Sequence, residues 1–454
     1  MKFAAIFLTA TASLATLIIP NLSSGSGLHA DNNSTSGTSV VEANVASDSK
    51  LHNVSGNYTL FPMPDASFEQ ERMGSFRLWD QQPTGRYIKR GQQVTVTVEN
   101  LANDLYLAVT VGFRPMWEPS EDQQEIRLDN GETEFVATQD GPIYLKLTSS
   151  PESFRSGTAV KVSVIGAHPL PLYVEGQTTT REWERQLEAY RNAPFVQLLS
   201  TRSLITLPVE DYRRHPVASP SRSLAAIDQI IGMSDELAGL DGDTPIHMPS
   251  PLRHHFLVDF RAPENPPFYM YATDEFIGLL SENFTGLTNP EELMTEWGVW
   301  HEIGHTYQQR SWTWEAMEEV SVNLFSLYIQ ENQGQPSRLS IPDEFGETPR
   351  QQAAKYIRQG GGNFMLPHSS DQEAFTRLVM LEELKNTYGW GLFKKMFRYF
   401  REHPQQDVDG RQAADSFIIV MSQLSGDDLS PFFKKWGLQT SGCLQKPPAL
   451  PSLR

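Results

Sequence analysis

Hydrophobic and polar residues alternate through the first third of the chain. Apolar side chains recur at every second position in four short runs, the spacing of a strand with one buried face. Turn-forming residues such as Asn130 and Gly131 separate these runs, which cover residues 94–98, 105–109, 143–147 and 160–164. Several short strands at this spacing predict a β-sandwich over residues 55–166.

The periodicity becomes helical beyond residue 166. Residues 180–199 and 223–240 carry apolar side chains three and four positions apart, which predicts two helices. Short apolar runs predict strands at residues 204–209, 256–260 and 268–271. Residues 348–438 alternate apolar and charged residues at helical spacing, which is typical of a helical bundle.

These patterns together predict a multidomain α+β protein. A β-sandwich over residues 55–166 would precede a mixed catalytic domain over residues 167–345. A helical subdomain would follow over residues 346–440, and residues 441–454 would form a tail.

The start of the chain has the pattern of an export signal. Lys2 precedes an apolar run over residues 3–19, and residues 28–30 offer a cleavage site. We expect residues 1–30 to be removed, which would leave a secreted mature chain without a membrane span; an uncleaved anchor is the alternative. Residues 31–54 are rich in Ser, Asn, Thr and Gly, and we expect them to form a flexible linker.

Charge and cysteine content exclude several classes of binding partner and also exclude stabilisation by disulfide bonds within the chain. The net charge of the 454 residues is −18, and no basic patch of the kind that nucleic acid or an anionic membrane requires is present in the sequence. Cys443 is the only cysteine, so no disulfide can form within one chain. The fold must therefore rest on ordinary apolar cores, and nothing in the pattern specifies an oligomeric state.

One short motif carries recognisable chemistry. His301 and His305 lie four positions apart, so on a helix both imidazoles fall on one face and can share one tetrahedral metal ion. Glu302 follows the first histidine, where a carboxylate can take a proton from water and deliver it to a leaving amine. The motif predicts a metallopeptidase with one Zn²⁺ ion, and a pair of core histidines without metal is the alternative reading.

The third metal ligand must lie downstream of the motif. A metzincin would have glycine at position 308 and histidine at position 311, whereas this chain has Gln308 and Ser311, which excludes that class. A second helix carrying a glutamate ligand is the other common solution. Residues 314–328 have that helical pattern, and their candidate ligands are Glu315, Glu318 and Glu319.

Helical spacing favours one of these glutamates. Glu318 shares its helix face with apolar residues such as Val322, which is a packing face, whereas Glu319 shares its face with Asn323. Asn323 lies one turn after Glu319 and is placed to accept a hydrogen bond from a ligating histidine; an ordinary polar position without such a role is the alternative. We therefore expect Glu319 to be the third ligand.

The motif residues also resemble the signature of a known family. Residues 297–308, WGVWHEIGHTYQ, and residues 319–326, EVSVNLFS, are similar to the signature of the enhancin-like metallopeptidases, peptidase family M60. Residues 84–91 resemble that family's N-terminal accessory module, and residues 428–437 resemble its C-terminal helix pattern.

The resemblance implies a gluzincin-type fold and a role in cleaving mucins and other heavily O-glycosylated proteins. It implies His301, His305 and Glu319 as zinc ligands and Glu302 as general base and acid. The expected protein is thus a secreted zinc endopeptidase with mucin-like substrates. Two other functions stay open: a secreted glycan-binding adhesion protein whose zinc helix is structural, and a gluzincin aminopeptidase.

Aromatic residues offer candidate substrate surfaces, but packing is the favoured role for each. Trp79 and Trp117 could stack on sugars, and Trp297 and Trp300 could border a glycan site, although tryptophan is more often buried. Residues 268–271 are a candidate edge strand beside the zinc helix, where a substrate backbone could pair with the sheet.

Overall fold

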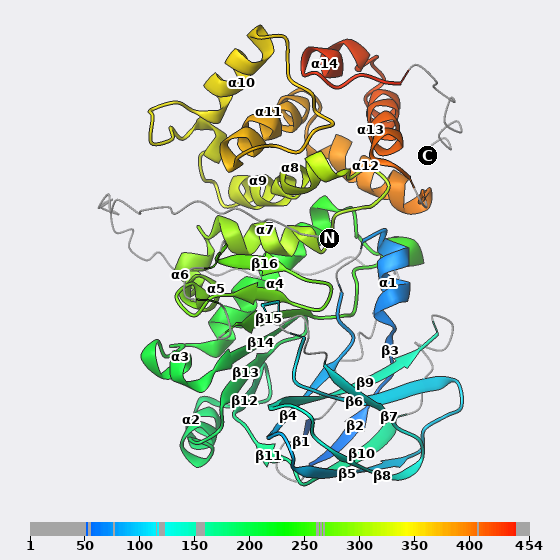
Figure 1. Ribbon diagram of the computed structural model, residues 1–454, viewed down its shortest axis with the longest axis vertical. Coiled ribbons are helices and arrows are strands. Elements are labelled where there is room, and N and C mark those ends of the chain that lie inside the picture. Colours follow the sequence, from blue (N-terminus) through cyan, green and yellow to red (C-terminus); the bar gives the residue numbers. More distant parts are fainter. Residues whose placement is uncertain are drawn as a thin grey trace, which may run out of the picture.

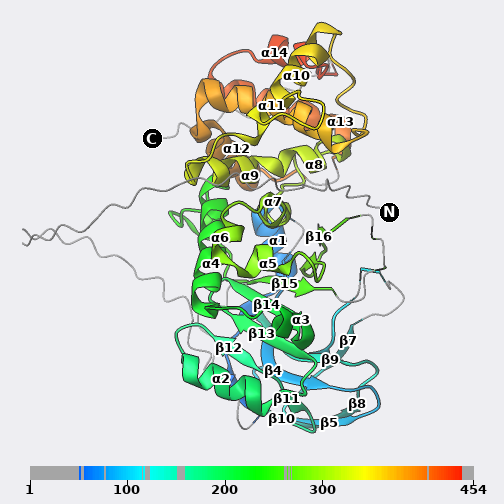
Figure 2. The ribbon, with the colours of Figure 1, turned by 90° about the vertical axis from the view of Figure 1, so that its left-hand side faces the viewer.

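The computed structural model describes residues 51–52, 56–75, 78–114, 116–117, 123–150, 159–259, 263, 266, 268–405 and 408–441. The expected signal peptide, most of the expected linker and most of the expected tail lie outside these residues. Figures 1 and 2 show three tiers along the long axis: β-strands at one end, a mixed sheet in the middle and helices at the other end.

Two mainly antiparallel sheets form the N-terminal tier, and the four predicted runs are all strands in them. The two sheets share one apolar core, to which alternate residues such as Val96 and Leu107 contribute. One sheet has the order β1 (Leu51–His52), β2 (Asn57–Leu60), β10 (Val160–Ile165), β5 (Gln93–Glu99), β8 (Gly131–Val136). The other has the order β11 (His168–Pro169), β4 (Gln82–Ile88), β9 (Gly141–Ser149), β6 (Leu105–Val111), β7 (Gln124–Arg127), with β3 (Met63–Pro64) beside β9.

Two short strands of this tier lie just outside the expected residues 55–166. Strand β1 lies in the range expected to be linker, and strand β11 lies beyond residue 166. Helix α1 (Ala66–Met73) interrupts the strands, begins where Asp65 caps its first turn, and ends at Gly74 in the left-handed region. The Gly74 carbonyl accepts a hydrogen bond from the backbone of Arg310 at 3.0 Å, so the first tier is tied to the neighbourhood of the motif.

A six-stranded mixed sheet forms the middle tier. Its order is β12 (Leu172–Val174), β13 (Phe195–Leu199), β14 (Ser203–Pro208), β15 (His254–Val258), β17 (Ile277–Leu279), β16 (Met270–Ala272). Strands expected near residues 204–209, 256–260 and 268–271 are β14, β15 and β16, and β16 is an edge strand as expected. Helices α2 (Thr180–Ala189), α3 (Val209–Arg214) and α4 (Pro220–Leu237) and the 3₁₀ turn η1 (Pro245–His247) accompany the sheet.

The helix expected over residues 180–199 was wrong in its second half. Helix α2 ends at Ala189, and the chain then enters strand β13, whose five residues are all buried. This strand pairs with β12 on one side and β14 on the other, so its apolar residues cover both faces of the sheet. A short, continuously apolar run cannot be assigned to helix or strand by periodicity alone, and pairing with two neighbours decided it.

The third tier is helical. After α5 (Phe284–Thr288) and α6 (Pro290–Leu293), helix α7 (Trp297–His305) carries the motif and packs against β16 and α9. The single helix expected over residues 314–328 is instead broken into η2 (Glu315–Met317), α8 (Glu318–Ser321) and α9 (Asn323–Asn332). The chain continues through η3 (Arg338–Ser340), α10 (Pro349–Arg358), α11 (Asp371–Tyr388), α12 (Trp390–Glu402), α13 (Gly410–Ser425) and α14 (Ser430–Lys435).

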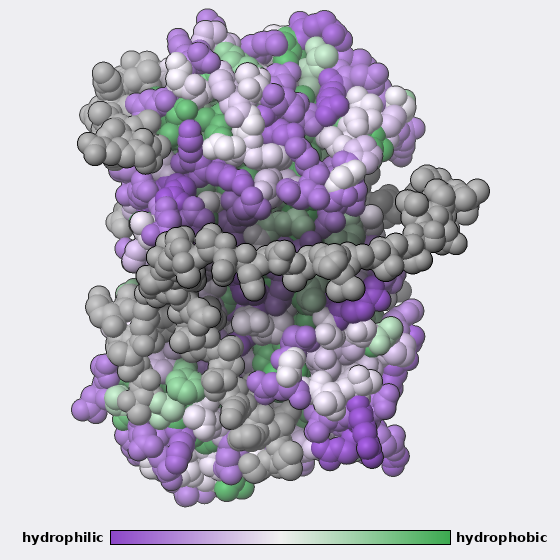
Figure 3. All heavy atoms as spheres, turned by 180° about the vertical axis from the view of Figure 1, so that it is seen from behind, coloured by the Kyte–Doolittle hydropathy of each residue, from purple (hydrophilic) through white to green (hydrophobic). Residues whose placement is uncertain are grey.

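One apolar core joins the middle and helical tiers. It includes Leu198 of the sheet, Ile303 of α7, Phe325 of α9 and Phe417 of α13. The expected division at residue 345 is therefore not a break in packing. No helix of the described ranges is long and apolar enough to cross a membrane. The face in Figure 3 carries mostly hydrophilic side chains with scattered apolar ones.

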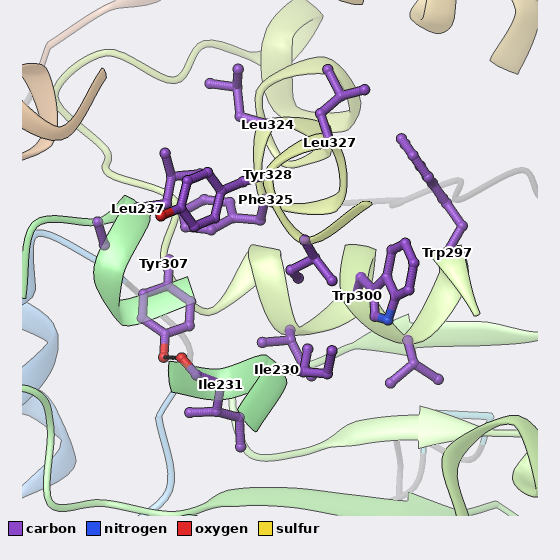
Figure 4. Close-up of a cluster of buried hydrophobic side chains, with 14 of the residues drawn as sticks. Ile230, Ile231, Leu237, Trp297, Trp300, Tyr307, Leu324, Phe325, Leu327 and Tyr328 are labelled. Carbon is purple, nitrogen blue, oxygen red and sulfur yellow. Dashed lines mark hydrogen bonds between the residues drawn. The ribbon is translucent and has the colours of Figure 1, made fainter. Parts of the chain in front are cut away.

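Close approach of α7 and α9 depends on one glycine. A Cβ atom at Gly304 would lie 2.9 Å from both the carbonyl oxygen and a methyl group of Val322, and 3.2 Å from the Phe325 Cβ atom. Figure 4 shows Trp297 and Trp300 on α7 and Phe325 and Tyr328 on α9 among the apolar side chains packed around these two helices. The helix that carries the motif is thus held at a distance that only glycine allows.

Gly304→Ala is expected to destabilise the protein by about 1–3 kcal/mol, because the added methyl group overpacks the contact with Val322. Gly232→Ala is the matched control, since a Cβ atom at Gly232 in helix α4 would meet none of the described residues outside its own helix within 4 Å. That control is expected to gain up to about 1 kcal/mol from helix propensity. Urea unfolding measures both, and a gain in stability for Gly304→Ala would contradict the packing argument.

Candidate metal centre

Helix α7 places the two motif histidines on one buried face. His301 and His305 are each 4% exposed, and their Nε2 atoms lie 3.1 Å apart with the rings nearly perpendicular. Glu319, in the first turn of α8, brings its Oε2 atom 3.0 Å from the His301 Nε2 and 3.6 Å from the His305 Nε2. The structure therefore brings together the three side chains that the sequence predicts as metal ligands.

The proton on His301 can be located from its neighbours. The indole N–H of Trp297 can only donate, and it donates to Asn323 Oδ1 at 2.9 Å. The same oxygen lies 2.8 Å from His301 Nδ1. An amide oxygen can only accept, so His301 carries its proton on Nδ1, as expected for a histidine whose partner is Asn323. In the neutral ring the Nε2 atom then carries a lone pair and no hydrogen.

His305 is held in the same tautomer by a residue that the sequence did not reveal. The Gln308 amide nitrogen donates to the carbonyl oxygen of Glu318 at 2.6 Å and to the Ser321 hydroxyl at 2.9 Å. Its oxygen must therefore face His305, whose Nδ1 lies 2.7 Å away. Gln308 is in the turn after α7, where helical spacing gives no direction to a side chain, so no sequence signal pointed to this role.

When both rings are neutral, two nitrogen lone pairs and a carboxylate oxygen therefore converge on one point. Zinc bonds of about 2.0–2.1 Å in a tetrahedron would separate such donors by about 3.3 Å. The observed separations of 3.0, 3.1 and 3.6 Å scatter around that value. Two imidazoles and one carboxylate are also a donor set that zinc accepts while keeping one position open, so these residues fit a zinc ion.

Electrostatics point the same way. Burial lowers the pKa of His301, but the hydrogen bond with Glu319 and the negative charges of Glu302 and Glu319 outweigh it and raise the pKa to about 9. Burial opposes ionisation of Glu319, yet the nearby His305 and the hydrogen bonds with both histidines hold its pKa well below the usual range. The centre thus favours one added positive charge, which a proton or a metal ion can supply.

Glu302 lies beside the donors and is 1% exposed. Ligand-type atoms of His301, Glu302 and His305 all lie within 4.8 Å of one another, and this is the single metal-type group of three or more found in the described ranges. A buried carboxylate at that distance can exchange a proton with water held at the centre.

Neighbouring aromatic residues have packing roles. Tyr307 is directed away from the two histidines, and its hydroxyl donates to Asp235 at 2.8 Å. Figure 4 shows its ring turned toward the helix that carries Ile230 and Ile231. The indoles of Trp297 and Trp300 are both buried and hydrogen-bonded, the second to the Leu293 carbonyl at 2.8 Å.

The two tryptophans considered as sugar platforms in the first tier also pack against other rings. Trp79 is buried and stacks on His255 with ring centres 4.1 Å apart. Trp117 stacks on Phe268 with ring centres 4.8 Å apart. Trp79 is thus a buried packing residue, and Trp117, which is half-buried, packs one face of its indole against Phe268.

Comparison with known proteins gives the same class of molecule. A family described as "Peptidase M60, enhancin and enhancin-like" matches residues 166–437. The TRPM8 channel-associated factor homolog of Xenopus laevis is 26% identical over 284 residues, which is 61% of this chain and 29% of that protein. TRPM8 channel-associated factor 3 of Rattus norvegicus is 23% identical over 366 residues, which is 78% of this chain and 38% of that protein. The chain thus spans only about a third of the length of these relatives.

Solved structures share the fold over most of the chain. A functionally unknown conserved protein from Bacillus anthracis strain Ames has a TM-score of 0.72 and 26% identity, and the match covers 85% of this chain and 76% of that one. The M60 catalytic domain of Clostridium perfringens ZmpC, solved in complex with the sialyl T antigen, has a TM-score of 0.66 and 19% identity, with 84% and 77% covered.

The fold and the family match define a metallopeptidase domain. More narrowly, the chain belongs to the enhancin-like M60 peptidases, which confirms the resemblance seen in the sequence. The family match extends through the helical tier, in agreement with the single core that joins this tier to the sheet.

Glu319→Ala is expected to lower bound zinc to well below one ion per chain, because one of three converging donors is lost. Glu318→Ala is the matched control: it removes a carboxylate from the preceding residue of the same turn and keeps the backbone carbonyl to which Gln308 donates. Zinc content after dialysis, measured by atomic absorption, compares the two. Equal zinc in Glu319→Ala and the wild-type protein would remove Glu319 from the ligand set.

Proposed function

We propose that this chain is a secreted zinc endopeptidase that cleaves O-glycosylated, mucin-like proteins. The observation that carries the proposal is the convergence of His301, His305 and Glu319 beside the buried carboxylate of Glu302. Family membership supports peptide-bond hydrolysis as the reaction.

The proposed division of labour assigns each side chain a distinct task. Zinc, when bound by the three donors, would polarise the scissile carbonyl and lower the pKa of the attacking water toward neutrality. Glu302 takes the proton from that water and delivers it to the departing nitrogen, so its carboxylate must be free of its own proton at the start of the reaction. The close fit of α7 against α9 supports the placement of these α7 residues beside Glu319, which lies just before α9.

Strand β16 is the proposed place for the substrate backbone. Among the described strands it lies at the edge of the six-stranded sheet, where it pairs with β17, and it packs directly against α7. A strand edge offers unpaired backbone donors and acceptors to an extended peptide. An interior segment of a polypeptide can bind in this way, which favours an endopeptidase over an enzyme that requires a free amino terminus.

The substrate class and the location are proposed on separate grounds. The ZmpC catalytic domain, which shares the fold, was solved with the sialyl T antigen, and this favours a glycan-bearing protein as substrate. The apolar run at residues 3–19 supports export. We assign residues 55–166 to an accessory β-sandwich, residues 167–345 to the catalytic domain and residues 346–440 to a helical subdomain that shares the catalytic core.

Glu302→Gln is expected to retain one zinc ion and to lose activity by about 10²–10⁴-fold, because glutamine cannot accept the water proton. Digestion of an O-glycosylated mucin, followed by mass-spectrometric mapping of product termini, gives the activity. Chelation of the wild-type enzyme should abolish cleavage, and added zinc should restore it. Full activity in a zinc-loaded Gln variant would exclude Glu302 as the base.

The same digest separates the proposed reaction from its alternatives. An endopeptidase yields internal cleavages and is indifferent to an acetylated amino terminus, whereas an aminopeptidase releases single residues and requires the free amine. Zinc binding without any cleavage would instead indicate an adhesion protein with a structural metal helix and would overturn the proposal.

A further inference from the structure

Two buried amide side chains connect the histidines to the backbone of the residues around the third ligand. Asn323 Nδ2 donates to the carbonyl oxygen of Glu319 at 2.8 Å, while its Oδ1 accepts from His301. Gln308 Nε2 donates to the carbonyl oxygen of Glu318 at 2.6 Å, while its Oε1 accepts from His305. Consecutive carbonyls of α8 are thus each linked, through one amide group, to a different histidine.

We propose that Asn323 and Gln308 act together as a brace that positions all three ligands as one unit before the metal binds. The inference rests on the proposed metal site and adds the means by which its geometry is set. Neither amide touches the reacting atoms in this role, so both are positioning residues. In the following, "amide brace" denotes these two side chains.

Neither amide group of the brace can flip its nitrogen and oxygen. Each amide nitrogen faces a backbone carbonyl, which can only accept, so each amide oxygen is forced to face an imidazole. A third contact fixes each group further: Trp297 donates to the Asn323 oxygen, and the Gln308 nitrogen reaches the Ser321 hydroxyl. The two amide residues are 3% and 1% exposed, so water cannot replace a lost contact without opening the core.

Helix α8 needs such support because it is too short to be stable on its own. It contains only the four residues Glu318–Ser321, between the 3₁₀ turn η2 and a break at Val322. A helix of one turn is unstable alone, and the Glu319 side chain is still 27% exposed. The position of the third ligand therefore depends on contacts from outside its own helix.

The amide brace has a measurable consequence for metal affinity. Ligands that are already ordered lose little conformational freedom when an ion binds, whereas a loose third ligand must be ordered at that moment. Loss of a hydrogen-bond partner of a metal ligand typically weakens metal binding 10–100-fold. Both amides donate to carbonyls of the same helical turn, so loss of either should let this turn move. Loss of the second amide should then cause a smaller further drop in zinc affinity.

Carboxylate variants separate the two halves of each amide. Gln308→Glu and Asn323→Asp keep an oxygen for the imidazole proton but place a second oxygen against the carbonyl of α8. We expect each to bind Zn²⁺ about tenfold more weakly than the wild-type protein, measured by competition with a fluorescent chelator. We expect the zinc affinity of the double variant to fall by less than the product of the two single fold-losses.

Absorption of the Co²⁺-substituted proteins provides a readout independent of catalysis. A displaced third ligand should change the intensity and position of the visible bands in both single variants, whereas a general loss of stability would leave the bands of folded protein unchanged. Gln309→Met is the matched control: Gln309 is equally buried, and its amide nitrogen donates to Phe397 and Met73 carbonyls at 2.9 and 3.3 Å. It should lower stability but keep zinc affinity and the cobalt spectrum.

The outcomes are distinct. Wild-type affinity in both carboxylate variants, or losses that multiply in the double variant, would overturn the amide brace while leaving the metal site intact. Failure of the wild-type protein itself to bind Zn²⁺ would instead sink the proposed function. The amide brace would be established if each single variant bound Zn²⁺ more weakly, the double variant lost less affinity than the product of the two single losses, and the cobalt spectrum changed.

Discussion

Two imidazole nitrogens and one carboxylate oxygen face one another at 3.0–3.6 Å, and this crowding of electron-rich atoms, which a cation relieves, is the constraint on which the centre depends. Amide oxygens hold the Nδ1 proton of each ring on the far side, so the Nε2 atoms face the centre and can take a metal ion or a second proton. Such an arrangement persists only because surrounding packing enforces it, and it is relieved by a cation. The raised pKa of His301 and the lowered pKa of Glu319 express that same demand.

Packing around α7 fixes the positions of these ligand side chains. Helix α7 lies between the edge strand β16 and helix α9, and glycines face both neighbours at the closest points. A Cβ atom at Gly298 would lie 2.8 Å from the Met270 sulfur, just as one at Gly304 would meet Val322. The two histidines therefore cannot move away from Glu319 without separating α7 from these neighbours. The first tier adds a further restraint, since Gly74 and Met73 accept hydrogen bonds from the residues that follow the motif.

The sequence was informative where chemistry follows from spacing along one helix. The period of one helix was enough to predict that His301, Glu302 and His305 lie together. The preference for Glu319 over Glu318 rested on helix faces, and the structure places Glu319 beside the histidines although the expected single helix is broken into three pieces. The alternating strands were likewise readable because each has one buried face. Gln308 was unreadable because it lies in a turn and acts across 10 residues of sequence, on Glu318. Strand β13 was misread because its burial on both faces is a property of the assembled sheet.

The core shared by the sheet and the terminal helices has a consequence for how the molecule melts. Leu198, Ile303 and Phe417 belong to one continuous apolar cluster, although 219 positions separate the first from the last in sequence (417 − 198). Regions joined in this way lose their order together, so the sheet, the motif helix and the C-terminal helices should denature in one cooperative transition. A ligand that binds at the centre would then raise the melting temperature of helices that it never touches.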